Sequence, residues 1–385
     1  MTAAEDTALA LLVDRFGRDA ILSAIERVAT LPVEVPSWGF GRGGTRFAVY
    51  ASDDVPHTVA GRIAAAGQFL RHTGKGKTVA LHFPWDGTTK KDIADVARFL
   101  KKAGVRAGSI NSNLFTPRPP FDERMRFGSL TNPDPAIRRA AIVHNLDCIA
   151  IMRKLGSKTL VAWIPDGTNS PGQMSLYDQA DRLDAAFRAI YKRLRPDEKL
   201  LIEYKYFEPG FYSTAIQDYG RSRSICRMLG SRAKVLVDLG HHAPTTNVEQ
   251  IVTHLLRSGD LGGFHFNDHA YADDDLATGS LNPGQLFRIF CALVEGERRG
   301  YAPVASLALM IDESHNIKNP SEEMVESLEN IETAYAKALL VDWPALQKAQ
   351  NQCDPSVADT ILRDAFLTDV RPILAQARSL TRGRE

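Results

Sequence analysis

The sequence predicts a parallel (β/α)8 TIM barrel with an N-terminal helix before it and a C-terminal helical extension after it. Two observations support this fold class. Eight short apolar runs are separated by amphipathic helical patterns, which is the order of elements in a closed parallel barrel. Most helical patterns end in basic or polar residues followed by glycine, which readily takes the left-handed conformation that ends a helix. These glycines are Gly74, Gly104, Gly156, Gly230, Gly259 and Gly300.

Each apolar run is short and bounded by turn residues, as expected of a strand buried on both faces of a parallel sheet. The first run contains Pro36 and is the weakest of the set. Residues 90–104 and 135–156 are two of the helical patterns between the runs, with apolar positions at helical spacing. The predicted strands are residues 33–40, 78–83, 107–112, 159–164, 200–205, 234–240, 263–268 and 306–312.

The barrel is expected at residues 33–318, between an N-terminal helical segment at 1–32 and a helical extension at 319–385. Residues 6–29 form one amphipathic helical pattern, and the extension is expected to pack on the barrel flank or across a subunit contact. A doubly wound open sheet is the competing fold. Its glycine-rich phosphate loop has one weak counterpart, residues 39–47, whose glycines stand alone because no acidic residue ends a second strand about 20 residues later.

Composition excludes several classes of protein. The 385 residues carry 47 basic and 46 acidic side chains, so the net charge gives no reason to expect a nucleic acid as partner. The four cysteines form no CxxC pair, which argues against a thiol-rich zinc site or a dense disulfide framework. The chain has no run of the ~20 apolar residues needed to cross a bilayer and no signal- or transit-peptide pattern at its start. We therefore expect a soluble cytoplasmic protein without a membrane partner.

Polar and aromatic residues end the predicted strands, where the active site of such a barrel lies. Four consecutive strands, the fifth to the eighth, end in Glu203, Asp238, His265 and Asp312. Taken singly, an Asp at a strand end is more often a helix cap, and a buried His is more often a hydrogen-bonded core residue. Three carboxylates pointed at one central spot repel one another strongly, and a divalent ion removes that conflict. Oxygen ligands with one imidazole suit Mn²⁺, Mg²⁺, Co²⁺ or Zn²⁺.

A second group of metal ligands is predicted from the loops after the sixth and seventh strands. Gly240 lets the chain turn sharply after Asp238, which brings His241 back over the barrel mouth. Asp273 and Asp275 are two residues apart, so in an extended chain they face the same way. An acidic run of this kind is by itself more typical of a solvated loop tip. Beside two histidines, we interpret it as part of a second metal site.

Two ions held by carboxylates and imidazoles fit several reactions, including hydride transfer between adjacent carbons of an open-chain sugar. Lys205 follows Glu203 by two positions and shares its face, where an ammonium can reach a substrate oxygen that gains charge. Aromatic residues near the strand ends are candidates for walls against the C–H faces of a sugar, with ordinary core filling as an equal alternative for each. They are Trp38, Trp85, Phe115 and Trp163.

Eight stretches of the sequence are long and specific: VPSWGFGRGGTRF, LHFPWD, INSNLF, WIPDGTNSPGQ, EYKYFEPGFYST, VDLGHHAPTTN, GGFHFNDHAYADDD and MIDESHN. In this order they resemble the L-rhamnose isomerase family, most closely its bacterial branch with broad aldose specificity. The likeness runs from about Val35 to the C-terminal helices. It implies an isomerase that interconverts L-rhamnose and L-rhamnulose, accepts other aldoses and moves hydrogen between C1 and C2 of the open-chain sugar.

The resemblance also implies roles for individual residues. The positions that hold a structural metal and contact substrate match Glu203, Asp238, His265 and Asp312, and those of a catalytic metal match His241, Asp273 and Asp275. The predicted catalytic residues are Glu203, Lys205, Asp312 and His82, the last as a candidate acid or base for ring opening. The sugar pocket matches Trp38, His82, Phe115, Trp163 and Lys205. Phe47 matches an aromatic residue that reaches into a neighbouring subunit's site. We expect two divalent ions per subunit, Mn²⁺ before Mg²⁺, Co²⁺ or Zn²⁺, and a homotetramer.

One position departs from the family pattern, and three alternatives stay open. Tyr204 stands where related members have His, but strand alternation points it away from the barrel interior, so the departure bears on substrate preference and not on the metal ligands. A ketose 3-epimerase on a similar barrel uses one metal and a pair of glutamates, which the second ligand group argues against. A metal-dependent phosphodiester nuclease conflicts with the near-neutral charge, and a barrel that only binds sugar conflicts with the retained ligand set.

Overall fold

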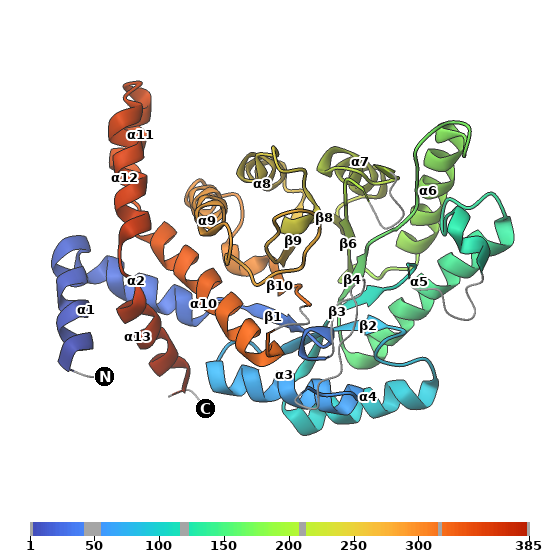
Figure 1. The fold of residues 1–385 in the computed structure, drawn as a ribbon, viewed down its shortest axis with the longest axis horizontal. Helices are drawn as coiled ribbons and strands as arrows, with labels where there is room; N and C mark the ends of the chain where they lie inside the picture. Colours follow the sequence, from blue (N-terminus) through green and yellow to red (C-terminus); the bar gives the residue numbers. More distant parts are fainter. Residues whose placement is uncertain (1–2, 42–54, 116–122, 208–212, 315–317, 383–385) are drawn as a thin grey trace.

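The computed structural model describes residues 3–41, 55–115, 123–207, 213–314 and 318–382. Eight parallel strands close into a barrel in the order β1-β10-β9-β8-β6-β4-β3-β2 (Figure 1). Each predicted apolar run overlaps one of these strands, so the predicted closed parallel barrel is confirmed. The strands are β1 (Val33–Pro36), β2 (Thr78–Phe83), β3 (Arg106–Ser112), β4 (Thr159–Ala162), β6 (Lys199–Glu203), β8 (Ala233–Asp238), β9 (Leu261–Phe266) and β10 (Ala308–Ile311).

The inside of the barrel holds a small apolar layer of its own. Its buried members come from five different strands and are Ala80, Val161, Leu201, Leu236 and Met310. The residues that flank these members on each strand face outward and pack under the surrounding helices. Because this layer fills the barrel, side chains that point inward beyond it are held at the mouth.

Helices cover the outside of the barrel (Figure 1). They are α3 (Val59–Thr73), α4 (Lys90–Ala103), α5 (Pro135–Leu155), α6 (Leu176–Tyr191), α7 (Tyr219–Leu229), α8 (Val248–Arg257), α9 (Pro283–Arg298) and α10 (Pro320–Leu339). Helix α4 begins with a capping box, in which Thr89 accepts from the amide of Asp92 and Asp92 accepts from the amide of Thr89. All six glycines predicted to end helices have positive φ, but Gly230, with ψ −174°, ends its helix in an extended and not a left-handed helical conformation.

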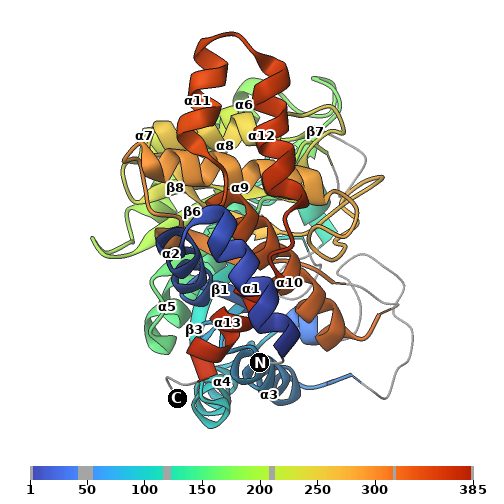
Figure 2. The same ribbon diagram turned by 90° about the vertical axis from the view of Figure 1, so that its left-hand side faces the viewer.

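The N-terminal segment differs from the single helix predicted over residues 6–29. It forms two helices, α1 (Ala3–Phe16) and α2 (Arg18–Ala29), because Gly17 has φ 86° and ψ 147°, which breaks the helical hydrogen-bond pattern. The apolar spacing continues across the break, so the pattern alone did not reveal it. Helix α2 packs against α10 and against the C-terminal helix α13 (Arg371–Arg382), and this joins the two ends of the chain on one flank (Figures 1 and 2).

Beyond α10 the chain forms a helical hairpin, α11 (Trp343–Asn351) and α12 (Pro355–Leu367), which projects from the barrel in both views (Figures 1 and 2). The loops at the mouth carry a two-stranded antiparallel sheet, β5 (Gly167–Thr168) with β7 (Ser213–Thr214), which was not predicted. Short 3-10 helices are η1 (Trp38–Phe40), η2 (Glu123–Phe127), η3 (Leu239–His241) and η4 (Val304–Ser306). Within the described ranges, no helix combines the length and the apolar character that crossing a membrane demands.

Candidate active site

The residues that gather at the barrel mouth lie two positions beyond the interior apolar layer on their own strands. Side chains two apart on a strand face the same way, so the strand period aims these residues at the barrel axis. The pairs of layer and mouth residues are Ala80 and His82, Val161 and Trp163, Leu201 and Glu203, Leu236 and Asp238, and Met310 and Asp312. His265 takes the equivalent place on β9, whose register sets it beside Asp238 of β8. The backbone therefore brings side chains from distant parts of the chain to one spot.

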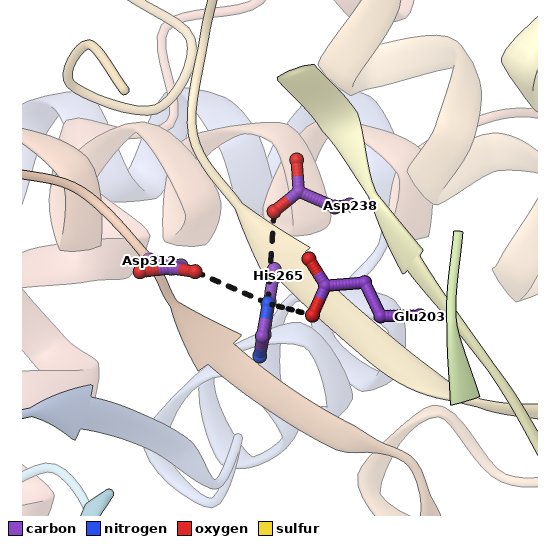
Figure 3. A group of neighbouring side chains, drawn as sticks. All are labelled: Glu203, Asp238, His265 and Asp312. Atoms are coloured by element: carbon purple, nitrogen blue, oxygen red, sulfur yellow. Dashed lines mark ion pairs between the residues drawn. The ribbon is translucent and has the colours of Figure 1, made fainter. Parts of the chain in front are cut away.

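One group of mouth residues surrounds the imidazole of His265, as Figure 3 shows. Its Nδ1 atom lies 3.3 Å from Glu203 Oε2, 3.6 Å from Asp238 Oδ2 and 3.2 Å from Asp312 Oδ2. One ligand atom from each of these four residues lies within 4.8 Å of all the others. The structure thus brings together the whole of the first predicted ligand set, and this group could hold a metal ion.

The electrostatics of this group favour a cation. Burial raises the pKa of Glu203, although the charges of His265 and His241 oppose the rise. Burial lowers the pKa of His265, but the attraction of Glu203 and Asp312 outweighs it and holds that pKa well above its ordinary value. Within the part of the chain that the structure describes, neither ring nitrogen of His265 makes a hydrogen bond. A buried imidazole without hydrogen bonds, set among three carboxylate oxygens, fits the donor set of a divalent ion.

A second group lies beside the first and shares one residue with it. Ligand atoms of Asp238, His241 and Asp273 lie within 4.8 Å of one another. His241 Nε2 is 3.2 Å from Asp273 Oδ2, while its Nδ1 lies 3.0 Å from the carbonyl oxygen of Tyr204. Donation from Nδ1 to that carbonyl leaves the Nε2 lone pair facing the carboxylates, which is the tautomer a metal ligand needs. Asp238 therefore stands between two groups that could each hold an ion.

The second group differs from the predicted one at two positions. Asp238 belongs to it, whereas Asp275 lies outside it among the described residues, although Asp275 does line the same pocket. The prediction assumed an extended chain between Asp273 and Asp275, but Asp275 has φ 51°, which turns the backbone. The chain does turn after Asp238, through η3, but Gly240 has no positive φ there, so the turn does not need the backbone freedom of glycine. Its small size matters instead, since a Cβ would lie 2.8 Å from Asp273 Oδ1.

Lys205 and Trp38 contact the acids of the two groups. Lys205 is buried, and its Nζ lies 2.6 Å from Asp273 Oδ2 and 5.4 Å from the centre of the Trp163 ring. The indole Nε1 of Trp38 donates to Asp312 Oδ1 at 2.9 Å. An aromatic side chain predicted as part of the sugar wall thus also orients one of the predicted ligands, a contact that the sequence did not suggest.

Aromatic side chains line the same pocket as the acids and form what we call its aromatic wall. The rings of His82 and Trp85 stack at 3.8 Å with an interplanar angle of 20°, and Phe115 packs edge-on against Trp163 at 4.7 Å. Trp38 meets the His82 ring edge-on at 5.4 Å. All the predicted wall residues therefore line one cavity of about 700 Å³, counted out to its open mouth.

Sequence reasoning missed two polar residues of this cavity, and one of its predicted site residues lies outside the part of the chain that the structure describes. Ser112 at the end of β3 and Ser314 beyond β10 both line the pocket. Their positions after apolar runs were visible, but a serine at a strand end carries no distinctive chemical signal. Phe47, predicted to reach a neighbouring subunit, lies outside the described residues.

Comparisons with known proteins agree with this geometry. The family described as "Xylose isomerase-like TIM barrel" matches residues 69–334. A "Probable sugar isomerase" of Mesorhizobium japonicum is 43% identical over 95% of this chain and 83% of its own length. A second "Probable sugar isomerase", from Rhizobium meliloti, is 42% identical over 95% of this chain and 85% of its own length.

Solved structures with the same fold are more distant. The D-allulose 3-epimerase of Methylomonas sp. superposes with a TM-score of 0.54 at 14% identity, covering 80% of this chain and 94% of that enzyme. An L-ribulose 3-epimerase superposes with a TM-score of 0.53 at 14% identity, covering 88% of this chain and 98% of the other. At such identities the likeness establishes the barrel fold and nothing finer.

Proposed function

We propose that this chain, which belongs to the xylose isomerase-like TIM-barrel family, is a metal-dependent aldose–ketose isomerase. Its substrates would be L-rhamnose and L-rhamnulose, with other aldoses also accepted. The observation that carries the proposal is the pair of ligand groups sharing Asp238 at the mouth, in a pocket also lined by aromatic side chains. The names of the two relatives, which are more than 40% identical, support the isomerase class.

Two divalent ions, Mn²⁺ by preference, would complete the site. Glu203, Asp238, His265 and Asp312 would hold the first ion. Asp238, His241 and Asp273 would hold the second, with Asp275 as a further ligand from the pocket wall. When bound, the ions would supply Lewis-acid polarisation of the sugar oxygens on C1 and C2, the two carbons between which hydrogen moves. A homotetramer is part of the proposal, with Phe47 supplied to a neighbouring subunit.

The remaining side chains would bind and orient the sugar. The aromatic wall excludes water and packs against the C–H faces of the open chain. Lys205, held at 2.6 Å from Asp273, places a positive charge where a sugar oxygen gains negative charge. His82 stacks on Trp85 at the pocket wall and is the candidate acid or base for ring opening. Trp38 keeps Asp312 fixed through its indole N–H.

Metal content and sugar turnover test the proposal together. Protein stripped with a chelator should convert L-rhamnose to a ketose only after Mn²⁺ is restored, with about two ions bound per subunit. A panel of other aldoses, run in parallel, would define the substrate range. Protein that binds no divalent ion, or that turns over no aldose once loaded, would contradict the assignment.

The same preparation separates isomerisation from ketose 3-epimerisation. An epimerase would convert fructose to its C3 epimer and would need a pair of glutamates on opposite faces of the carbon. Of the described residues that line the pocket, one is a glutamate, Glu203. We therefore expect ketose formation from rhamnose and no epimer from fructose. Reaction in D₂O then distinguishes hydride transfer from an enediol, because full solvent exchange of the migrating hydrogen rules out the transfer.

A further inference from the structure

A buried carboxylate outside both ligand groups ties the aromatic wall together. The Asp86 residue is 1% exposed and lies just beyond β2. Its Oδ2 accepts from the Ser37 hydroxyl at 2.6 Å and from the backbone amide of His82 at 2.9 Å, and its Oδ1 accepts from Arg62 Nη2 at 2.8 Å. These donors belong to three different segments: the end of β1, the end of β2 and helix α3. One side chain thus fixes the relative positions of two strand ends and a helix.

Each of these bonds leads directly to a pocket residue. Ser37 immediately precedes Trp38, whose indole donates to Asp312 at 2.9 Å. The His82 amide belongs to the residue whose ring stacks on Trp85 at 3.8 Å. Arg62, besides pairing with Asp86, donates to the carbonyl oxygen of Trp85 at 3.3 Å. The rings of Trp38, His82 and Trp85 are therefore all positioned by residues that donate to Asp86 or that adjoin such a donor.

We propose that Asp86 is a positioning residue for the sugar pocket. It holds Trp38, His82 and Trp85 in the arrangement that receives the substrate, and it acts on Asp312 through Trp38. This inference rests on the proposed function for its substrate, although the positioning itself concerns the ligand-free protein. Asp86 touches neither ligand group in the contacts above, so its loss should change how the sugar binds more than how the metal binds.

The rival explanation is that Asp86 only stabilises the turn after β2. A matched control exists at the other end of the barrel. Glu198 is likewise a buried carboxylate paired with an arginine, Arg153, at 2.7 Å, and it likewise accepts a backbone amide, that of Arg195, at 2.7 Å. It immediately precedes β6, at the strand end opposite to the mouth. Glu198→Gln therefore reports the cost of weakening such a cluster where no pocket depends on it.

The experiment compares Asp86→Asn, Ser37→Ala and Glu198→Gln in the full-length Mn²⁺-loaded protein. Asp86→Asn is expected to raise KM for the best aldose at least about tenfold, with a smaller change in kcat and Mn²⁺ affinity within about twofold of the wild type. Ser37→Ala removes one of the three hydrogen bonds to Asp86, and it is expected to raise KM by only a few-fold. Ser37→Ala also carries the test if Asp86→Asn does not fold. Glu198→Gln should lower the unfolding temperature and leave KM within about twofold.

A ligand-free readout makes the test independent of the substrate. The chain has four tryptophans, so ¹⁹F-labelled tryptophan gives a small set of signals assignable by substitution. Asp86→Asn and Ser37→Ala should shift the Trp38 signal, and Asp86→Asn should also shift that of Trp85. The signal of Trp343, on the distant helix α11, should stay in place. If no aldose is turned over by the wild type, the proposed function fails, and the fluorine signals alone decide the role of Asp86. Lower stability with unmoved signals and unchanged KM would overturn the inference.

Discussion

At the end of the barrel where the strands begin, the buried side chains of Lys75 and Glu198 each lie against a countercharge, whereas at the mouth buried acids outnumber lysines and arginines. Before β2, Lys75 lies 2.8 Å from Glu332, with both side chains 1% exposed, and it also donates to the carbonyl of Val28. Before β6, Glu198 accepts two bonds from Arg153. At the mouth, Lys205 pairs with Asp273, while the ion-pair partners of Glu203 among the described residues are the histidines His241 and His265.

The difference indicates what each end is selected to do. A pair closed by lysine or arginine is complete within the chain and needs nothing from solution. A surplus of buried carboxylates is unfavourable in the isolated chain and becomes favourable when a cation enters. The first arrangement therefore contributes to folding, and the second prepares a site at a cost in stability.

The largest expected effect comes from breaking the charge pair at the closed end. Lys75→Met removes the partner 2.8 Å from Glu332 and leaves that buried carboxylate with Arg378 at 3.7 Å, so it is expected to cost up to about 3–5 kcal/mol of unfolding free energy. Urea unfolding measures this loss, and turnover at a permissive temperature should be unchanged. The double variant Lys75→Met/Glu332→Leu should recover most of the stability, because no charge is then left unpaired. A double variant as unstable as the single one would mean that packing, and not charge, dominates there.

A change at the mouth should have the opposite sign for stability. Glu203→Gln removes a carboxylate whose pKa burial raises, so the metal-free variant is expected to be more stable at neutral pH, by the roughly 0.5–2 kcal/mol typical of a single stabilising substitution. Turnover should fall about 10²–10³-fold, because the first ion loses a ligand. Calorimetry of metal-free protein and the Mn²⁺ assay measure the two effects. A metal-free variant less stable than the wild type would show that Glu203 is already compensated by its histidine neighbours.

These two regions also show how far the sequence could be read. The barrel and the first ligand group follow from local patterns: an apolar run fixes the strand, and the residue two positions beyond its interior member points to the mouth. The sharing of Asp238 between two groups does not follow, because it depends on the three-dimensional approach of η3 to the loop that carries Asp273. The role of Asp86 was hidden for the same reason, since its side-chain donors Ser37 and Arg62 lie 49 and 24 residues away.

Another buried acid, Glu323 on α10, is expected to make the stability of the protein depend on pH. Burial raises its pKa from 4.5 to about 7, with Lys318 lowering it and Glu326 raising it. Between about pH 4.5 and 7, the folded protein therefore keeps a proton on the Glu323 carboxyl that the unfolded chain has lost. The contribution of this carboxyl to stability falls as the pH rises through that range. Glu323→Gln cannot titrate, so at pH 8 it should be more stable than the wild type by up to about 3 kcal/mol and nearly equal at pH 4.5.

Unfolding curves of both proteins at several pH values test this difference, because contributions from titrating groups far from Glu323 cancel between them. If the free-energy difference between Glu323→Gln and the wild type stays constant from pH 4.5 to 8, the carboxyl is already ionised or already neutral throughout. The 3% exposure of Glu323 makes such constancy unexpected.

The smallest expected effect concerns the helix ends, which differ between the two sides of the barrel. Helices α3 and α4 begin on the mouth side with threonine caps and end on the other side in left-handed glycines. Thr89→Ala removes the bond to the Asp92 amide and half of the capping box, and is expected to cost about 1 kcal/mol without changing metal content or turnover. Thr89→Ser keeps the cap and serves as control. A fall in Mn²⁺ affinity in the alanine variant alone would mean that the cap of α4 also supports the mouth, because the segment between His82 and Thr89 carries both Trp85 and Asp86.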